Sequence, residues 1–179
     1  MGDTLITVIA IFLAAILMFV FPLMSISERN DDISQLSVAT STVEFVDNIR
    51  STGKITLDNY DKFLQRLSST GNSYDVELEV RVLDENPLKK ASEADITKIG
   101  ENVYYSIYTT QIEEELGIGV KNPRKTTKLL KEGDIVIVTV KNTNTTIAQM
   151  LKNFFYSISG NDTYSIEASH SGVVMTTGK

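Results

Sequence analysis

Few side chains in this sequence could carry chemistry. The chain has no cysteine, a single histidine (His170), and 17 basic against 23 acidic residues, for a formal net charge of −6. Without cysteine it can form no disulfide, thiolate metal site or thiol nucleophile, and one histidine cannot build a multi-histidine metal site. The acidic balance disfavours nucleic-acid binding, which requires a basic face. Carboxylates, hydroxyls and His170 are therefore the groups to consider.

His170 stands between Ser169 and Ser171, within a segment that has the pattern of a β-strand. Neighbouring side chains of a strand point to opposite faces, so neither serine is placed as a catalytic partner of the imidazole. No acidic or nucleophilic motif surrounds these residues. We expect His170 to be a structural histidine on the apolar face of the strand.

The acidic clusters give no stronger signal. Asp31-Asp32 and Asp84-Glu85-Asn86 could each ligate calcium, but neither has the spaced acidic loop of a dedicated site. The run Glu113-Glu114-Glu115 is typical of a solvated helix face. We therefore predict no catalytic, metal-binding or cofactor-binding residue, no cofactor, no small-molecule substrate, and a protein that is not an enzyme.

An apolar segment near the amino terminus is the most informative feature. From Leu5 to Met24, 18 of 20 residues are apolar and none is charged, with Thr7 and Pro22 as the interruptions. Twenty helical residues rise about 30 Å, the thickness of a bilayer hydrocarbon core. Residues 1–24 are thus predicted to be a transmembrane segment. A cleaved signal peptide and a buried helix of a soluble core are the alternatives; the first normally has a basic start and a shorter apolar stretch.

Within that segment we identify candidate positions for membrane contact and helix packing: Leu5, Ala10, Ala14, Phe21 and Pro22. Ala10 and Ala14 lie four residues apart on one helical face, which allows a second helix to approach closely. Pro22 lacks a backbone donor and is expected to bend the helix where it leaves the bilayer. The residues just after the segment are mostly acidic, with Arg29 as the one basic residue among them. This charge distribution favours an extracytoplasmic carboxyl-terminal domain.

The helical pattern continues beyond the apolar segment. Residues 25–54 are predicted to form an amphipathic stalk helix that runs to about Arg50 and stops at Gly53. Its expected apolar stripe consists of Ile26, Ile33, Leu36, Thr40, Val43 and Val46. Thr56 then has the position of an N-cap for a second, shorter helix that ends before Gly71.

Residues 55–179 are predicted to form an α+β head domain. Tyr74–Val82 alternates between apolar and charged residues, which predicts a strand with one packed face, and Ile135–Val140 is apolar on both faces, which predicts a central strand. We further expect strands at Val103–Thr109 and Tyr164–Met175, helices at Gln111–Leu116 and Thr146–Ile158, and a basic loop at Lys121–Lys131. The fold class is then α+β: a long helix, followed by a small antiparallel sheet with packed helices.

This layout resembles type IV pilin-like proteins, and most of all the TadE-like minor pilins of tight-adherence pili. The resemblance rests on that layout and on the segments Thr4–Val8, Val43–Lys54 and Gly133–Val140. Gly2 stands where the family has the glycine of its cleavage site. Thr7 stands where the family has a glutamate, and no basic leader precedes Gly2, so the processing signal of the family is not matched.

The resemblance implies a single-pass membrane protein, located in the cell membrane or a cell-surface filament. It would serve as a structural or accessory subunit of a pilus or secretion apparatus, with the membrane and other pilin-like subunits or secretion-assembly proteins as partners. The residues themselves leave two alternatives open. One is a membrane-tethered extracytoplasmic binding or sensory domain without a filament role, and the other is a secreted domain released by signal peptidase.

Overall fold

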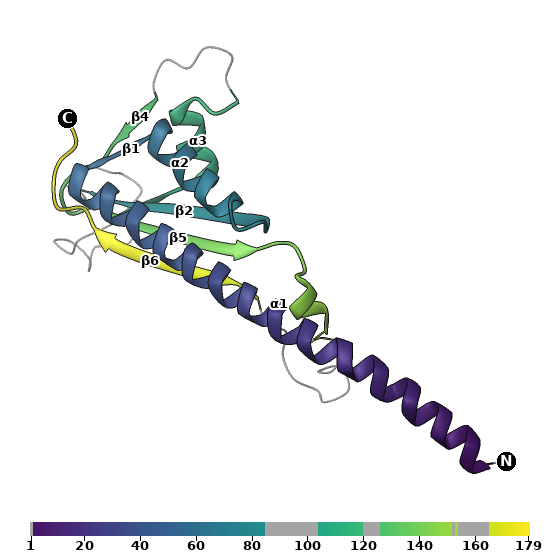
Figure 1. Cartoon of the computed structure of the whole chain (residues 1–179). Coiled ribbons are helices and arrows are strands. Elements are labelled where there is room, and N and C mark those ends of the chain that lie inside the picture. Colours follow the sequence, from purple (N-terminus) through teal and green to yellow (C-terminus); the bar gives the residue numbers. More distant parts are fainter. Residues whose placement is uncertain (1, 85–103, 120–125, 152, 154–164) are drawn as a thin grey trace, which may run out of the picture.

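The computed structural model describes residues 2–84, 104–119, 126–151, 153 and 165–179. It shows an α+β protein in which one long helix leads into a small head (Figure 1). Helix α1 runs without interruption from Gly2 to Thr52 and passes through Pro22. We call residues 2–30 of α1 the projecting half, because they extend away from the head, and residues 31–52 the packed half (Figure 1). The predicted continuation of the apolar helix into a stalk helix is confirmed.

A glycine ends α1, as the sequence predicts. Gly53 has a φ angle of 66°, in the left-handed region that favours glycine, and its N–H donates to the carbonyl of Ile49 at 2.8 Å. A side chain at this position would also collide with the backbone of Thr176 and Gly178, which crosses the end of the helix. The carboxyl-terminal tail and the end of α1 are thus packed backbone to backbone.

After α1 the chain forms a short strand and then a second helix. Strand β1 covers Lys54–Thr56 and helix α2 covers Leu57–Ser68. The Thr56 hydroxyl accepts a hydrogen bond from the backbone N–H of Asn59 at 3.2 Å, which satisfies one of the free donors of the first turn. The predicted N-cap and helix are therefore confirmed.

Four antiparallel strands form the main sheet, in the order β3-β2-β5-β6. In the register between β2 and β5, Leu78 lies opposite Val138 and Val80 opposite Val136. The predicted central position of Ile135–Val140 is confirmed. The bounds are Tyr74–Leu83 for β2, Tyr104–Tyr108 for β3, Ile135–Asn142 for β5 and Glu167–Val173 for β6. Strand β6 is shorter than the expected Tyr164–Met175: position 164 lies outside the described residues, and residues 174–175 are no longer part of the strand.

A second, two-stranded sheet corrects one of the predictions. Strand β4, Thr127–Leu129, pairs antiparallel with β1, although the sequence predicted a basic loop over Lys121–Lys131. Lys128 is buried, and its ammonium group lies 2.8 Å from a carboxylate oxygen of Glu115. Strands of three residues are too short to show a period, which is why the pattern did not reveal them. Positions 120–125 of that loop lie outside the described residues.

Two further helices lie in the head. Helix α3, Thr109–Leu116, ends at Gly117 with a φ angle of 79°, which confirms the predicted helix and its stop. Residues 147–151 and 153 are helical and confirm the start of the helix expected at Thr146–Ile158, whereas most of its second half lies outside the described residues. At the start of this helix the apolar Ile147 and Met150, which its spacing places among the residues expected to pack, are exposed, while Ala148 and Gln149 are buried.

The hydrophobic core lies on one face of the main sheet. Helices α1, α2 and α3 all contribute to it, and the ring of Phe45 in α1 stacks on that of Phe63 in α2 with centroids 4.4 Å apart. Its fully buried large side chains are Val38, Val46, Ile49, Ile55, Leu78, Val80, Ile112, Leu116, Val136, Val138, Val140 and Ile166. On the opposite face, side chains such as Thr139 and Ser169 are half-buried or exposed.

The packed half of α1 does not bury the stripe that the sequence predicted. Of that stripe only Val46 is in the core, and Leu36, for example, is 69% exposed. The face that it buries against the sheet and α2 consists of Asp31, Ser34, Val38, Ser41, Thr42, Phe45, Val46 and Ile49. Small side chains on this face let the helix lie close to the strands, and the buried Thr42 hydroxyl donates to the carbonyl of Val38 at 2.8 Å.

Candidate membrane anchor and its attachment to the head

The projecting half of α1 is an apolar helix that the head does not cover. Helix α1 contains a stretch long and apolar enough to cross a membrane, and none of that stretch is buried in the structure. A soluble protein of this size rarely exposes a continuous apolar surface of such length. The helix is therefore a candidate membrane span.

The five predicted packing residues all lie on this exposed helix. Leu5, Ala10, Ala14, Phe21 and Pro22 are each exposed, and the structure brings none of them against another element of the head. Ala10 and Ala14 do share one helical face, as their spacing requires. Their predicted role in contacts with lipid or with a second helix stays a prediction.

Where the projecting half ends, a buried carboxylate attaches α1 to the head. Asp31 is 4% exposed, and its Oδ2 accepts a hydrogen bond from the Thr146 hydroxyl at 2.7 Å. Thr146 also accepts from the backbone N–H of Gln149, while the Gln149 side chain accepts from the backbone N–H of Thr146. This is a capping box, so one threonine both starts the short helix and holds α1. The spacing Thr146-x-x-Gln149 is the sequence signal that could have revealed the capping box.

One helical turn further along, a glutamine side chain pairs with the edge of the sheet. The Gln35 amide donates to the carbonyl of Glu167 at 2.7 Å and accepts from its backbone N–H at 3.1 Å. A primary amide offers the same donor and acceptor pair as a peptide group. Gln35 therefore takes the place of a neighbouring strand at the outer edge of β6 and blunts it against pairing with another chain.

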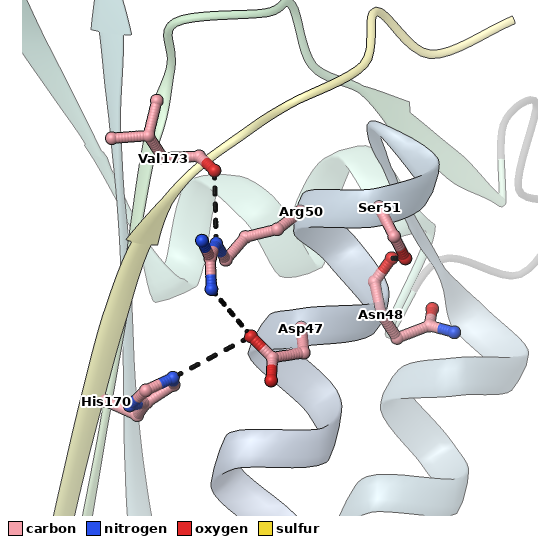
Figure 2. A network of polar contacts seen from close by, with 6 residues as sticks. All are labelled: Asp47, Asn48, Arg50, Ser51, His170 and Val173. Carbon is pink, nitrogen blue, oxygen red and sulfur yellow. Dashed lines mark hydrogen bonds and ion pairs between the residues drawn. The ribbon is translucent and has the colours of Figure 1, made fainter.

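Near the end of α1 an arginine makes the third attachment (Figure 2). The Arg50 guanidinium donates to the carbonyl of Val173 at 3.1 Å and forms an ion pair with Asp47 at 2.7 Å. Gly172 makes room for it, because a Cβ at that position would collide with the Arg50 side chain. A glycine in a strand often marks such a close approach, but sequence alone does not say what approaches.

His170 lies beside this arginine and faces α1 rather than a catalytic partner (Figure 2). Its Nε2 atom is 3.9 Å from the Asp47 carboxylate, is itself buried, and has no hydrogen-bond partner. The Ser169 hydroxyl bonds instead to Thr139 across the sheet at 3.0 Å. His170 thus lies between α1 and the sheet, whereas Ser169 points to the opposite face of the sheet.

A further polar contact joins helices α2 and α3. The Tyr60 hydroxyl of α2 donates to the Glu113 carboxylate of α3 at 2.8 Å. Burial raises the pKa of the Tyr60 phenol far above its ordinary value, and the bond to Glu113 adds to the effect. The phenol therefore remains a donor over the whole physiological range.

A groove between α1 and α2, of about 260 Å³, is lined by Phe45, Phe63 and polar side chains, most of which already have partners. Asn59 donates to Asn48 at 2.8 Å, and Arg66 pairs with Glu44. Among the described residues there is no group of three or more histidine, cysteine, aspartate or glutamate side chains that could hold a metal ion. The best-defined arrangement in the described part of the chain is accordingly mechanical: an apolar helix whose second half is fixed to the head by polar contacts of Asp31, Gln35 and Arg50.

A scan against protein-family models and searches against curated proteins and solved structures found no match to this chain.

Proposed function

We propose that this chain is a single-pass, membrane-anchored, pilin-like protein, a structural or accessory subunit of a pilus or secretion apparatus with its head outside the cytoplasm. One observation carries the proposal. A single helix has an uncovered apolar half of bilayer length, and its other half is fixed across a four-stranded antiparallel sheet. This is the layout that the sequence resemblance implies.

The distribution of polar groups supports an anchor of this kind. A helix can span lipid because it satisfies its own backbone hydrogen bonds. The Thr7 hydroxyl, the polar side chain inside the apolar segment, donates to the carbonyl of Asp3 at 2.7 Å and is therefore satisfied within the helix as well. An anchor attached rigidly to its head would hold the head at a fixed position relative to neighbouring subunits.

Shearing of cells tests the filament role. A tagged full-length chain should appear both in the membrane fraction and in the sheared surface fraction. Recovery in the membrane alone would contradict a filament subunit.

The mature amino terminus tests the anchor. Intact-mass measurement should retain residues 5–24; a chain that begins near Glu28 would show that the segment is a removed signal peptide. A mass that begins at Asp3 would show cleavage after Gly2 despite Thr7.

A membrane-tethered binding domain is the second candidate, because the open face of the sheet has a hollow. It measures about 440 Å³ and is lined in part by Glu79, Tyr108 and Ile137. A tethered binder would stay in the membrane fraction after shearing, and binding of a ligand to this hollow would depend on Tyr108.

A further inference from the structure

A second exposed apolar surface lies at the base of the head, beside the point where the projecting half of α1 ends. We call Ile26, Ile147 and Met150 the base patch. Ile26 belongs to α1, while Ile147 and Met150 belong to the short helix and are 57% and 61% exposed. On that helix Ala148 and Gln149 face the head, so the two apolar side chains lie on its outer face.

The base patch is continuous with the apolar half of α1. Ile26 and Ile147 line one hollow of about 430 Å³, together with polar residues of α1, including Ser27, Asn30 and Asp31, and of the adjacent loops. The hydrogen bond between Thr146 and Asp31 fixes the start of the short helix to α1. In Figure 1 this short helix lies at the end of the head nearest to the projecting half.

Helix geometry places the patch at the height of lipid headgroups. If the hydrocarbon core ends at Met24, Ile26 lies about 3 Å beyond it and Asp31 about 10 Å beyond, at about 1.5 Å per residue. Each headgroup layer is roughly 5–8 Å thick. A tilt of about 20°, the average for membrane helices, would lower a group about 10 Å from the helix axis by a further ~3 Å if α1 leans toward the short helix. With α1 tilted in this direction, Ile147 and Met150 reach the bilayer interface.

We propose that the base patch is seated in the headgroup layer of the membrane that α1 spans, with Ile147 and Met150 directed toward the acyl chains. The inference rests on the proposed membrane span. Asp31, the acidic side chain among those lining the hollow, is buried and hydrogen-bonded, so it presents no free charge to the lipid. Insertion removes exposed apolar surface from water and holds the head close to the bilayer.

Tryptophan fluorescence tests the position of the patch, because the chain contains no tryptophan and one introduced residue is a unique probe. The full-length Met150→Trp variant is reconstituted in phosphatidylcholine vesicles that contain lipids brominated near the headgroup end of the acyl chains. We expect it to lose about half or more of its emission. The matched control is Leu129→Trp, an exposed apolar position on β4 away from the base; it should keep its emission.

A third variant separates this inference from the proposed span. Phe12→Trp, in the middle of the apolar segment, should be quenched by lipids brominated deep in the acyl chain. Failure of that quenching overturns both proposals. Quenching of Phe12→Trp, together with Met150→Trp emission no more quenched than that of Leu129→Trp, overturns the base patch alone. If the emission of Met150→Trp is blue-shifted but not quenched by bromolipids, protein such as a second copy of the chain covers the patch. This result also overturns the proposal for the base patch. Ile147→Trp repeats the test, and circular dichroism confirms that each variant is folded.

Discussion

The two halves of α1 place their apolar side chains in opposite ways. From Leu5 to Met24 the projecting half is apolar on every side, and the head buries none of these side chains. The packed half buries apolar side chains such as Val46 and Ile49 together with small polar ones such as Ser34 and Thr42. Its Ile33 and Leu36 face outward. One uninterrupted helix thus meets two surroundings, and the change falls at Asp31, the first residue that the head buries.

This difference shows that the apolar character of a residue does not by itself decide whether the head buries it. Single exposed apolar side chains are ordinary on a protein surface, whereas a long continuous apolar surface indicates a partner outside the chain, such as lipid. Packing against a sheet also depends on how closely two backbones can approach, which small side chains permit. In the packed half, hydrogen bonds that involve Asp31, Gln35 and Arg50 add to the attachment that the buried apolar side chains supply.

The largest expected effect tests the assignment of the two faces of the packed half. Ile49→Ala removes a fully buried side chain and should lower the free energy of unfolding by about 2–5 kcal/mol, because it leaves a cavity. Leu36→Ala on the outward face should change it by less than about 0.5 kcal/mol. Urea unfolding followed by circular dichroism measures both. Equal losses would show that the outward stripe is covered after all.

A charge in the projecting half tests whether its surroundings are lipid. Ala14→Arg should reduce membrane insertion by about 2.5–3.5 kcal/mol on insertion scales, roughly a hundredfold in partition. The control is Thr40→Arg, an exposed position of the packed half, which should insert normally. Fractionation of membranes after carbonate washing gives the distribution. Normal retention of Ala14→Arg would contradict the anchor.

The junction between the halves is tested at Thr146. Thr146→Ala removes the N-cap of the short helix and the hydrogen bond to the buried Asp31, and should cost about 1–2 kcal/mol of stability. Thr145→Ala is the matched neighbour, since Thr145 is exposed. Thermal unfolding of the two variants should therefore differ by several degrees. No difference would mean that Asp31 does not hold α1.

The smallest effect concerns the sheet face that α1 leaves open. Hydrogen bonds from Arg81 and Ser106 hold the pKa of Glu79 below its ordinary range. A carboxylate with a lowered pKa stabilises the fold above its unfolded pKa, and this contribution is lost as the pH falls through its folded pKa. Glu79→Gln should therefore weaken the acid dependence of stability slightly without changing how α1 is attached. An unchanged pH profile of unfolding would contradict this role.

Much of the fold follows from short-range signals in the sequence. Thr56 and Gly53 marked the limits of α2 and α1, and the alternation in Tyr74–Val82 gave β2 nearly residue by residue. These signals work because caps and strand alternation depend on neighbours in the chain. The three-residue strands β1 and β4 carry no period and were missed.

The attachment of α1 could not be predicted in the same way. The role of Gln35 depends on its pairing with Glu167 in an edge strand, 132 residues later in the chain. The space for the Arg50 side chain depends on Gly172, 122 residues later. Nothing in the local pattern tells a surface glutamine from one that pairs with a strand edge. The candidate anchor was foreseen, since its composition and length suffice to indicate it, whereas the way the head holds it was not.

The contacts of α1 also fix an order of events during synthesis. Its partner groups on β6 and in the tail lie more than 100 residues later in the chain, at Glu167, Val173 and Met175. The packed half therefore leaves the ribosome long before the surface it will rest on exists. Contacts so distant in sequence form slowly, because a long loop must close first. Completion of the head thus waits for synthesis of residues 167–175, and a product truncated before them would carry the long apolar helix with no docked head.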